Sequence, residues 1–155
     1  TEPRLRVAGW SWSALLAGRV GALLASTAVV AAAYFVLVAV DRPIGDTAGI
    51  GLMLAVTACT GVALGCALGA LVGRELEGAL LLFIVAGLQF TVDPAGTFAQ
   101  LLPFWSTREL ATVAIEGAGA ASVAGALAHA AAVVLLCGAV AVAATERRLR
   151  ARRRG

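Results

Sequence analysis

The chain has 155 residues, of which 61% are hydrophobic, and its mean hydropathy is +0.93. Soluble domains are only about 45–50% apolar, so this composition excludes a water-soluble protein. The net charge of +3 results from twelve arginines and nine acidic residues, and the absence of lysine excludes a P-loop ATPase, whose lysine must reach the outer phosphates.

Four stretches of the sequence lack Asp, Glu and Arg: residues 20–40, 47–73, 78–92 and 119–145. The first, second and fourth are long enough to cross about 30 Å of hydrocarbon as α-helices. We therefore predict an all-α, polytopic membrane protein with four transmembrane helices over these ranges. The whole chain, residues 1–155, is expected to form one transmembrane domain.

Residues 1–19 precede the first of these helices and are basic and mildly amphipathic. Trp10 and Trp12 lie at the distance from the first helix where indole rings favour the headgroup layer. We predict a cytoplasmic, interfacial segment here. The polar turn at residues 41–46 is too short for a domain and predicts an external hairpin between the first two helices.

The second helix carries small residues at every fourth position. They are Thr57 and the four residues of what we call the glycine ridge, Gly61, Gly65, Gly69 and Gly73. Such a ridge lets another helix approach closely enough for dispersion contacts to hold it. We predict that it serves helix packing, and a role in lining a pathway is the less favoured alternative.

The third stretch is too short for a full crossing, because fifteen residues give a helix of about 22 Å. We predict that the external segment after it, residues 93–118, is a short, broken, re-entrant helix pair that completes the wall in the outer leaflet. Its first helix is predicted to start at Asp93, a good N-cap before Pro94. Four residues at helical spacing form its apolar face: Phe98, Leu101, Leu102 and Trp105.

Pro103 is predicted to break that first helix. Ser106 and Glu109 then have the spacing of a capping box, which predicts the start of a second short helix. Gly117 and Gly119 are expected to end it before the last membrane helix begins.

The distribution of arginines predicts the orientation. If each helix crosses once from a cytoplasmic N-terminus, ten arginines lie inside and only Arg42 and Arg108 lie outside. We therefore expect a multi-pass protein of a bacterial inner (plasma) membrane with both termini in the cytoplasm. The basic cytoplasmic tail, residues 146–155, is interpreted as an anchor on anionic membrane lipid and not as a nucleic-acid site.

No catalytic motif, metal site or disulfide is expected. Cys59, Cys66 and Cys137 lie within apolar stretches, where a thiol behaves as a small apolar residue. His129, the only histidine, lies about halfway along the last helix and should face the protein interior. A neutral packing role for it is favoured over a role in proton or substrate transfer.

Three features occur in a characteristic order. A basic segment, Thr1-Glu2-Pro3-Arg4-Leu5-Arg6, leads into a helix, and after two more helices a broken external segment places aromatics after a proline, Leu101-Leu102-Pro103-Phe104-Trp105. A last helix then ends in an arginine-rich tail. This order resembles the later part of the permease subunit of type-2 ABC exporters, over nearly the whole chain. Since that family usually has six helices per subunit, the resemblance implies that this chain supplies the last four.

The resemblance also implies a function. The chain would pair with a second copy or a related permease and with two ABC ATPase subunits, and would form the path for a hydrophobic or lipid-linked compound. It would be no enzyme and hold no cofactor, since ATP and magnesium would bind the ATPase. The residues implied in contact with the ATPase are Arg4, Leu5 and Arg6. Those implied in lining or closing the outer end of the path are Phe98, Leu102, Phe104 and Trp105.

Two alternatives from other classes stay open. The first is a non-transporting membrane scaffold or assembly subunit, in which the glycine ridge and the arginine tail serve only packing and anchoring. The second is a carrier or membrane enzyme built on His129.

Overall fold

The computed structural model describes residues 12–41, 46–72, 75–93, 96–117 and 120–154. Within these ranges the structure consists of helices joined by turns, without strands, which confirms the predicted all-α class. The elements are α2 (Trp12–Asp41), α3 (Thr47–Val72), α4 (Glu75–Thr91), the 3₁₀ helix η1 (Thr97–Leu101), α5 (Trp105–Glu116) and α6 (Ala120–Arg154).

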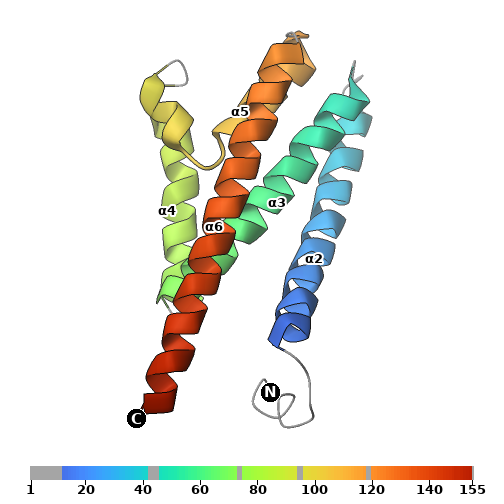
Figure 1. The fold of residues 1–155 in the computed structure, drawn as a ribbon. Helices are drawn as coiled ribbons and strands as arrows, with labels where there is room; N and C mark the ends of the chain where they lie inside the picture. Colours follow the sequence, from blue (N-terminus) through green and yellow to red (C-terminus); the bar gives the residue numbers. More distant parts are fainter. Residues whose placement is uncertain (1–11, 42–45, 73–74, 94–95, 118–119, 155) are drawn as a thin grey trace.

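Helix α3 is the centre of the bundle and packs against α2, α4, α5 and α6 (Figure 1). Helix α5 also packs against α6, so α3, α5 and α6 form a three-helix core. In Figure 1, α4 and α2 flank this core on opposite sides, and α6 crosses α3. The ends of α2 and α5 and the starts of α3 and α6 lie together at one end of the bundle.

The core between α3, α5 and α6 is built mainly of small side chains. The buried residues of these three helices are Thr60, Leu64, Ala67, Ser106, Leu110, Ala126 and Ala130. Small residues allow helices to approach closely. In a membrane, helices associate mainly through such close packing, because lipid tails are as apolar as the side chains and the hydrophobic effect does not drive association.

Large apolar side chains cover the outside of the bundle. Val29, Leu37 and Phe83 are 70%, 68% and 78% exposed, and none of the side chains described in α2 is buried. Three helices are long and apolar enough to cross a membrane, over Ala14–Val40, Thr47–Val72 and Ser122–Arg148. These features indicate a membrane protein, because such a surface is stable in lipid and not in water.

Helix bounds differ from the charge-free stretches mainly at the two ends of the chain. Helix α3 matches the predicted range closely, but α2 begins at Trp12 and so includes Arg19, and α6 continues through the arginine tail to Arg154. Because arginine has a high helix propensity, the helix can continue through charged residues where the apolar stretch ends. Helix α4, with 17 residues, is a shorter apolar helix, as its sequence indicated.

The far end of α3 is joined to α6 by a side chain. Arg148 Nη2 donates a hydrogen bond of 2.9 Å to the carbonyl oxygen of Leu71, one residue before α3 ends. The start of α2 lies at this same end of the bundle (Figure 1).

Candidate functional site

Residues 96–117, within the segment predicted to be external, form helix, break and helix, but the first helix is shorter than predicted. That helix is η1, a 3₁₀ helix that starts after Gly96 and not after Asp93. The carbonyl oxygen of Asp93 instead accepts a hydrogen bond of 3.1 Å from the Gly96 backbone N–H, which closes a turn.

The 3₁₀ geometry changes which residues share a face. Ala99 and Leu102 are 4% and 8% exposed, whereas Phe98 and Leu101 are 61% and 75% exposed. A 3₁₀ helix has three residues per turn, so residues three apart align and residues four apart do not. The apolar face predicted from α-helical spacing is therefore wrong, since Leu102 points inward and Phe98 and Leu101 point outward.

The break occurs at Pro103 as predicted, and α5 begins two residues later without the predicted capping box. Its N-cap residue is Phe104, which makes no side-chain capping bond, and Ser106 lies within the first turn. The end of α5 was predicted correctly. Gly117 adopts the left-handed conformation with φ of 75°, and its N–H donates to the carbonyl oxygen of Val113 at 2.9 Å.

The start of α5 contacts both neighbouring helices through polar or aromatic groups. Thr57 on α3 and Thr107 on α5 are joined by a hydrogen bond of 3.2 Å between their hydroxyl oxygens. The Trp105 ring meets the His129 ring of α6 edge to face, with centroids 5.2 Å apart and planes at 73°. His129 is half-buried and lies against α5, as expected for a polar side chain in that apolar stretch.

Five polar side chains on three helices belong to these contacts or lie within one helical turn of them. We call them the polar layer: Thr57, Thr60, Ser106, Thr107 and His129. Thr60 and Ser106 are completely buried, and their hydroxyl oxygens make no hydrogen bond with any described residue. Sequence analysis predicted the burial of neither, since it gave Ser106 a capping role. Thr60 lies in a charge-free stretch, where a polar residue should face the interior, so for Thr60 the sequence did give a signal.

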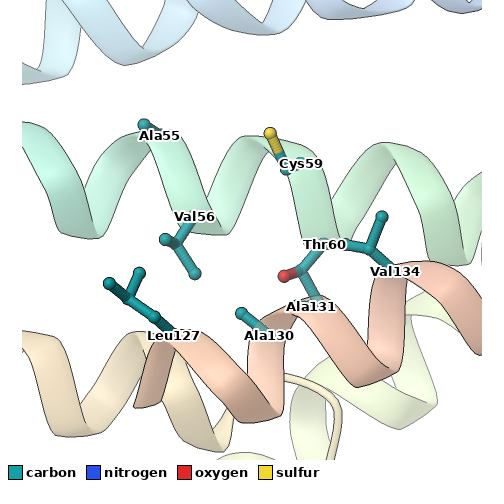
Figure 2. A pocket seen from close by; sticks show the side chains of 8 residues that line it. All are labelled: Ala55, Val56, Cys59, Thr60, Leu127, Ala130, Ala131 and Val134. Carbon is teal, nitrogen blue, oxygen red and sulfur yellow. The ribbon is translucent and has the colours of Figure 1, made fainter. Parts of the chain in front are cut away.

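A groove of about 280 Å³ runs between α3 and α6 beside the polar layer. Its lining residues are Ala55, Val56, Cys59, Thr60, Leu127, Ala130, Ala131 and Val134. Figure 2 shows the Thr60 hydroxyl pointing between the two helices, toward the space that Val56 and Ala130 border. Apart from Thr60, the lining is aliphatic or thiol, so the groove suits an uncharged, apolar occupant.

The glycine ridge lies away from the buried face of α3. A Cβ atom built on Gly61, Gly65 or Gly69 would meet nothing within 4 Å among the described residues, whereas the buried face is formed by Thr60, Leu64 and Ala67. One close approach exists, because a Cβ atom on the buried Gly78 of α4 would lie 4.0 Å from the backbone nitrogen of Gly69.

The residues that the resemblance assigned to the path lie in one region, but not on one face. Leu102 is buried, Phe104 and Trp105 are half-buried, and Phe98 is exposed. The ATPase-contacting residues, Arg4, Leu5 and Arg6, and the last residue of the glycine ridge, Gly73, lie outside the described residues.

Among the described residues, no three metal-ligating side chains lie close enough together to bind one ion. Comparisons with protein-family models, with curated proteins and with solved structures find no match to this chain.

Proposed function

We propose that the chain is a membrane-spanning permease subunit, or the C-terminal part of one, in an ATP-driven exporter similar to the type-2 ABC exporters. It forms part of the path for a hydrophobic or lipid-linked compound. Magnesium and ATP bind to separate ABC ATPase subunits, because the lysine-free chain cannot form a P-loop.

The observation that carries this proposal is the position of the broken external segment. Figure 1 shows the chain leaving the top of α4, turning after η1 at a point partway along α6, and returning to the top of the bundle through α5. The turn packs inward through Leu102 and Trp105. A break at membrane depth requires partners for its backbone, and the Trp105 N–H supplies one by donating to the Leu102 carbonyl oxygen at 3.1 Å.

This arrangement supports a re-entrant pair in the outer leaflet, with α4 as a fourth, shortened crossing. Seventeen residues of α4 span about 25 Å, and η1 and α5 cover the remaining height. The start of α2 and the end of α6 lie at the opposite end of the bundle from the starts of α3 and α6 (Figure 1). Arg19 is in the first half of α2, and Arg147 and Arg148 are near the end of α6, which favours a cytoplasmic location for both termini in a bacterial plasma membrane.

ATP binding drives transport only if it favours one arrangement of two membrane halves over another. A second permease copy or a related permease therefore completes the path. The open glycine ridge on α3 is a surface that a second helix can approach closely, at Gly61 and Gly65 in particular. The same ridge also supports the alternative function of a non-transporting scaffold, so it does not distinguish the two.

Purification in mild detergent from its own bacterium, followed by reconstitution into vesicles, separates these functions. The permease proposal predicts a copurified ATPase and a flux of fluorescent lipid or apolar dye that requires Mg-ATP. Reversing the charges of Arg4 and Arg6 together should abolish the flux and leave membrane insertion intact. Flux that is independent of ATP, with no ATPase bound, would instead assign the chain to the scaffold class.

A further inference from the structure

Four buried polar atoms lack hydrogen bonds with the described residues, and one of them, Nε2 of Gln89, lies on α4. The other three lie on the core helices α3, α5 and α6. They are the Thr60 hydroxyl oxygen on α3, the Ser106 hydroxyl oxygen on α5 and Nδ1 of His129 on α6. An unsatisfied polar group away from water costs several kcal/mol in hydrocarbon, so three of them in one small core require a partner.

Other serine and threonine hydroxyls in the helices donate hydrogen bonds to backbone carbonyl oxygens of their own helix. Thr57, Thr112 and Thr145 each donate to the carbonyl oxygen four residues earlier, at distances of 2.7–3.1 Å, and Ser26 and Thr27 do the same. Thr60 is in the middle of a regular helix, where that carbonyl is equally within reach, yet its hydroxyl is directed between α3 and α6 (Figure 2). Its hydrogen-bonding capacity is therefore left for a group outside its own helix.

Contacts made by neighbouring residues indicate that Thr60, Ser106 and His129 lie at a similar level of the bundle. Thr57 touches Thr107, the neighbour of Ser106, and Thr60 lies about one helical turn beyond Thr57. Trp105, the other neighbour of Ser106, contacts His129. The residue after His129, Ala130, borders the same groove as Thr60.

Above this level the hydroxyls of α3 and α5 meet directly, as Thr57 and Thr107 do, but Thr60 and Ser106 do not. Of the three residues, Thr60 also lines the groove between α3 and α6. We propose that the polar layer binds one hydroxyl-sized group, which donates to and accepts from Thr60, Ser106 and His129.

Such a group has the right bonding capacity. A buried water typically makes about three hydrogen bonds to polar groups that are otherwise unsatisfied, and an imidazole nitrogen and two hydroxyls provide three such groups. The group is either an internal water or the hydroxyl of an apolar molecule that occupies the aliphatic groove. This site does not depend on the proposed export function, because it concerns only the chain's own core.

Thermal unfolding in detergent of Thr60→Val, Ser106→Ala and the double variant tests the site. Each single substitution should lower the Tm by about 3–8 °C, because it leaves the remaining polar atoms without their shared partner. The double variant should lose clearly less than the sum, since the partner is already lost in either single variant. Thr60→Ser keeps a hydroxyl and should retain most of the stability even if the double variant cannot be purified.

Thr27→Val is the matched control, because Thr27 bonds its own helix and lies on α2, away from the layer. Its effect should add to that of Thr60→Val. Titration with a long-chain alcohol and with the alkane of equal length identifies the group. An alcohol-specific rise in Tm that disappears in Thr60→Val assigns the hydroxyl of an apolar molecule, whereas coupled variants without an alcohol effect assign water. Additive variants without an alcohol effect, or a Thr60→Val chain as stable as the wild type, would overturn the proposal.

Discussion

Arg148 on α6 donates a hydrogen bond from its guanidinium to the carbonyl oxygen of Leu71 at the end of α3, at 2.9 Å. The last carbonyls of a helix have no partner within that helix, and the helix dipole favours a cation there. The contact therefore stabilises the end of α3 and fixes the position of α6 against it. The arginine tail does more in this structure than the membrane anchoring that its sequence indicated.

Replacing Arg148 should accordingly destabilise the bundle. We expect Arg148→Gln to lower the free energy of unfolding by about 1 kcal/mol, because the contact is exposed and a single capping interaction is modest in size. The neighbouring Arg147→Gln serves as the control for the loss of one positive charge. Denaturation in a mixed-detergent titration measures both, and equal effects of the two substitutions would contradict a capping role for Arg148.

Leu110 on α5 is the most deeply buried large side chain in the core, at 2% exposure. Leu110→Ala should destabilise the protein by about 1–3 kcal/mol, less than in many soluble proteins, because lipid tails are as apolar as leucine and mainly the packing is lost. Ile115 lies on the same helix and is 80% exposed, so Ile115→Ala should have an effect near zero. The same denaturation assay measures the free energy of unfolding of both variants. An equal loss for Ile115→Ala and Leu110→Ala would mean that α5 does not pack against the core through the face that contains Leu110.

Gly117 ends α5 in a conformation that side chains with a Cβ atom rarely adopt, with φ of 75°. Gly117→Val should cost more than about 1 kcal/mol, and Gly117→Asn distinctly less, because asparagine tolerates the left-handed region. Nothing lies within 4 Å of the position of a new Cβ atom among the described residues, so crowding does not contribute. Thermal unfolding of both variants measures the difference; equal losses would show that the backbone conformation is not the cause.

The sequence predicted most of the helices because absence of charge is a local property. The range of α3, the break at Pro103 and the end of α5 at Gly117 were all found from residue types and spacing. The first helix of residues 93–118 was not, because η1 is a short 3₁₀ helix whose period of three residues places Phe98 on the exposed face.

The polar layer escaped prediction because it depends on how three helices cross. Ser106 fitted a capping box with Glu109, but its hydroxyl is buried in the core instead of capping α5. Nothing in the spacing of Thr60 and His129 brings them to one level, since they are 69 positions apart in the sequence. Tertiary contacts alone determine which of the scattered hydroxyls in apolar stretches face one another.

Substitutions in the glycine ridge test whether the ridge packs within one chain or between two chains. Gly61→Leu and Gly65→Leu should disturb the folding of the single chain little, because the first added carbon at either position would meet nothing within 4 Å among the described residues. If a second permease helix docks on the ridge, both substitutions should prevent the pairing, since leucine keeps the helix backbones apart.

Gly78→Leu is the contrasting variant, because Gly78 is buried where α4 approaches Gly69. This substitution should destabilise the fold of the single chain. Size-exclusion chromatography with light scattering measures pairing, and thermal unfolding measures the fold. A loss of thermal stability in Gly61→Leu equal to that in Gly78→Leu would mean that the ridge is packed within one chain. Intact pairing in both ridge variants would place the contact between copies elsewhere on the surface.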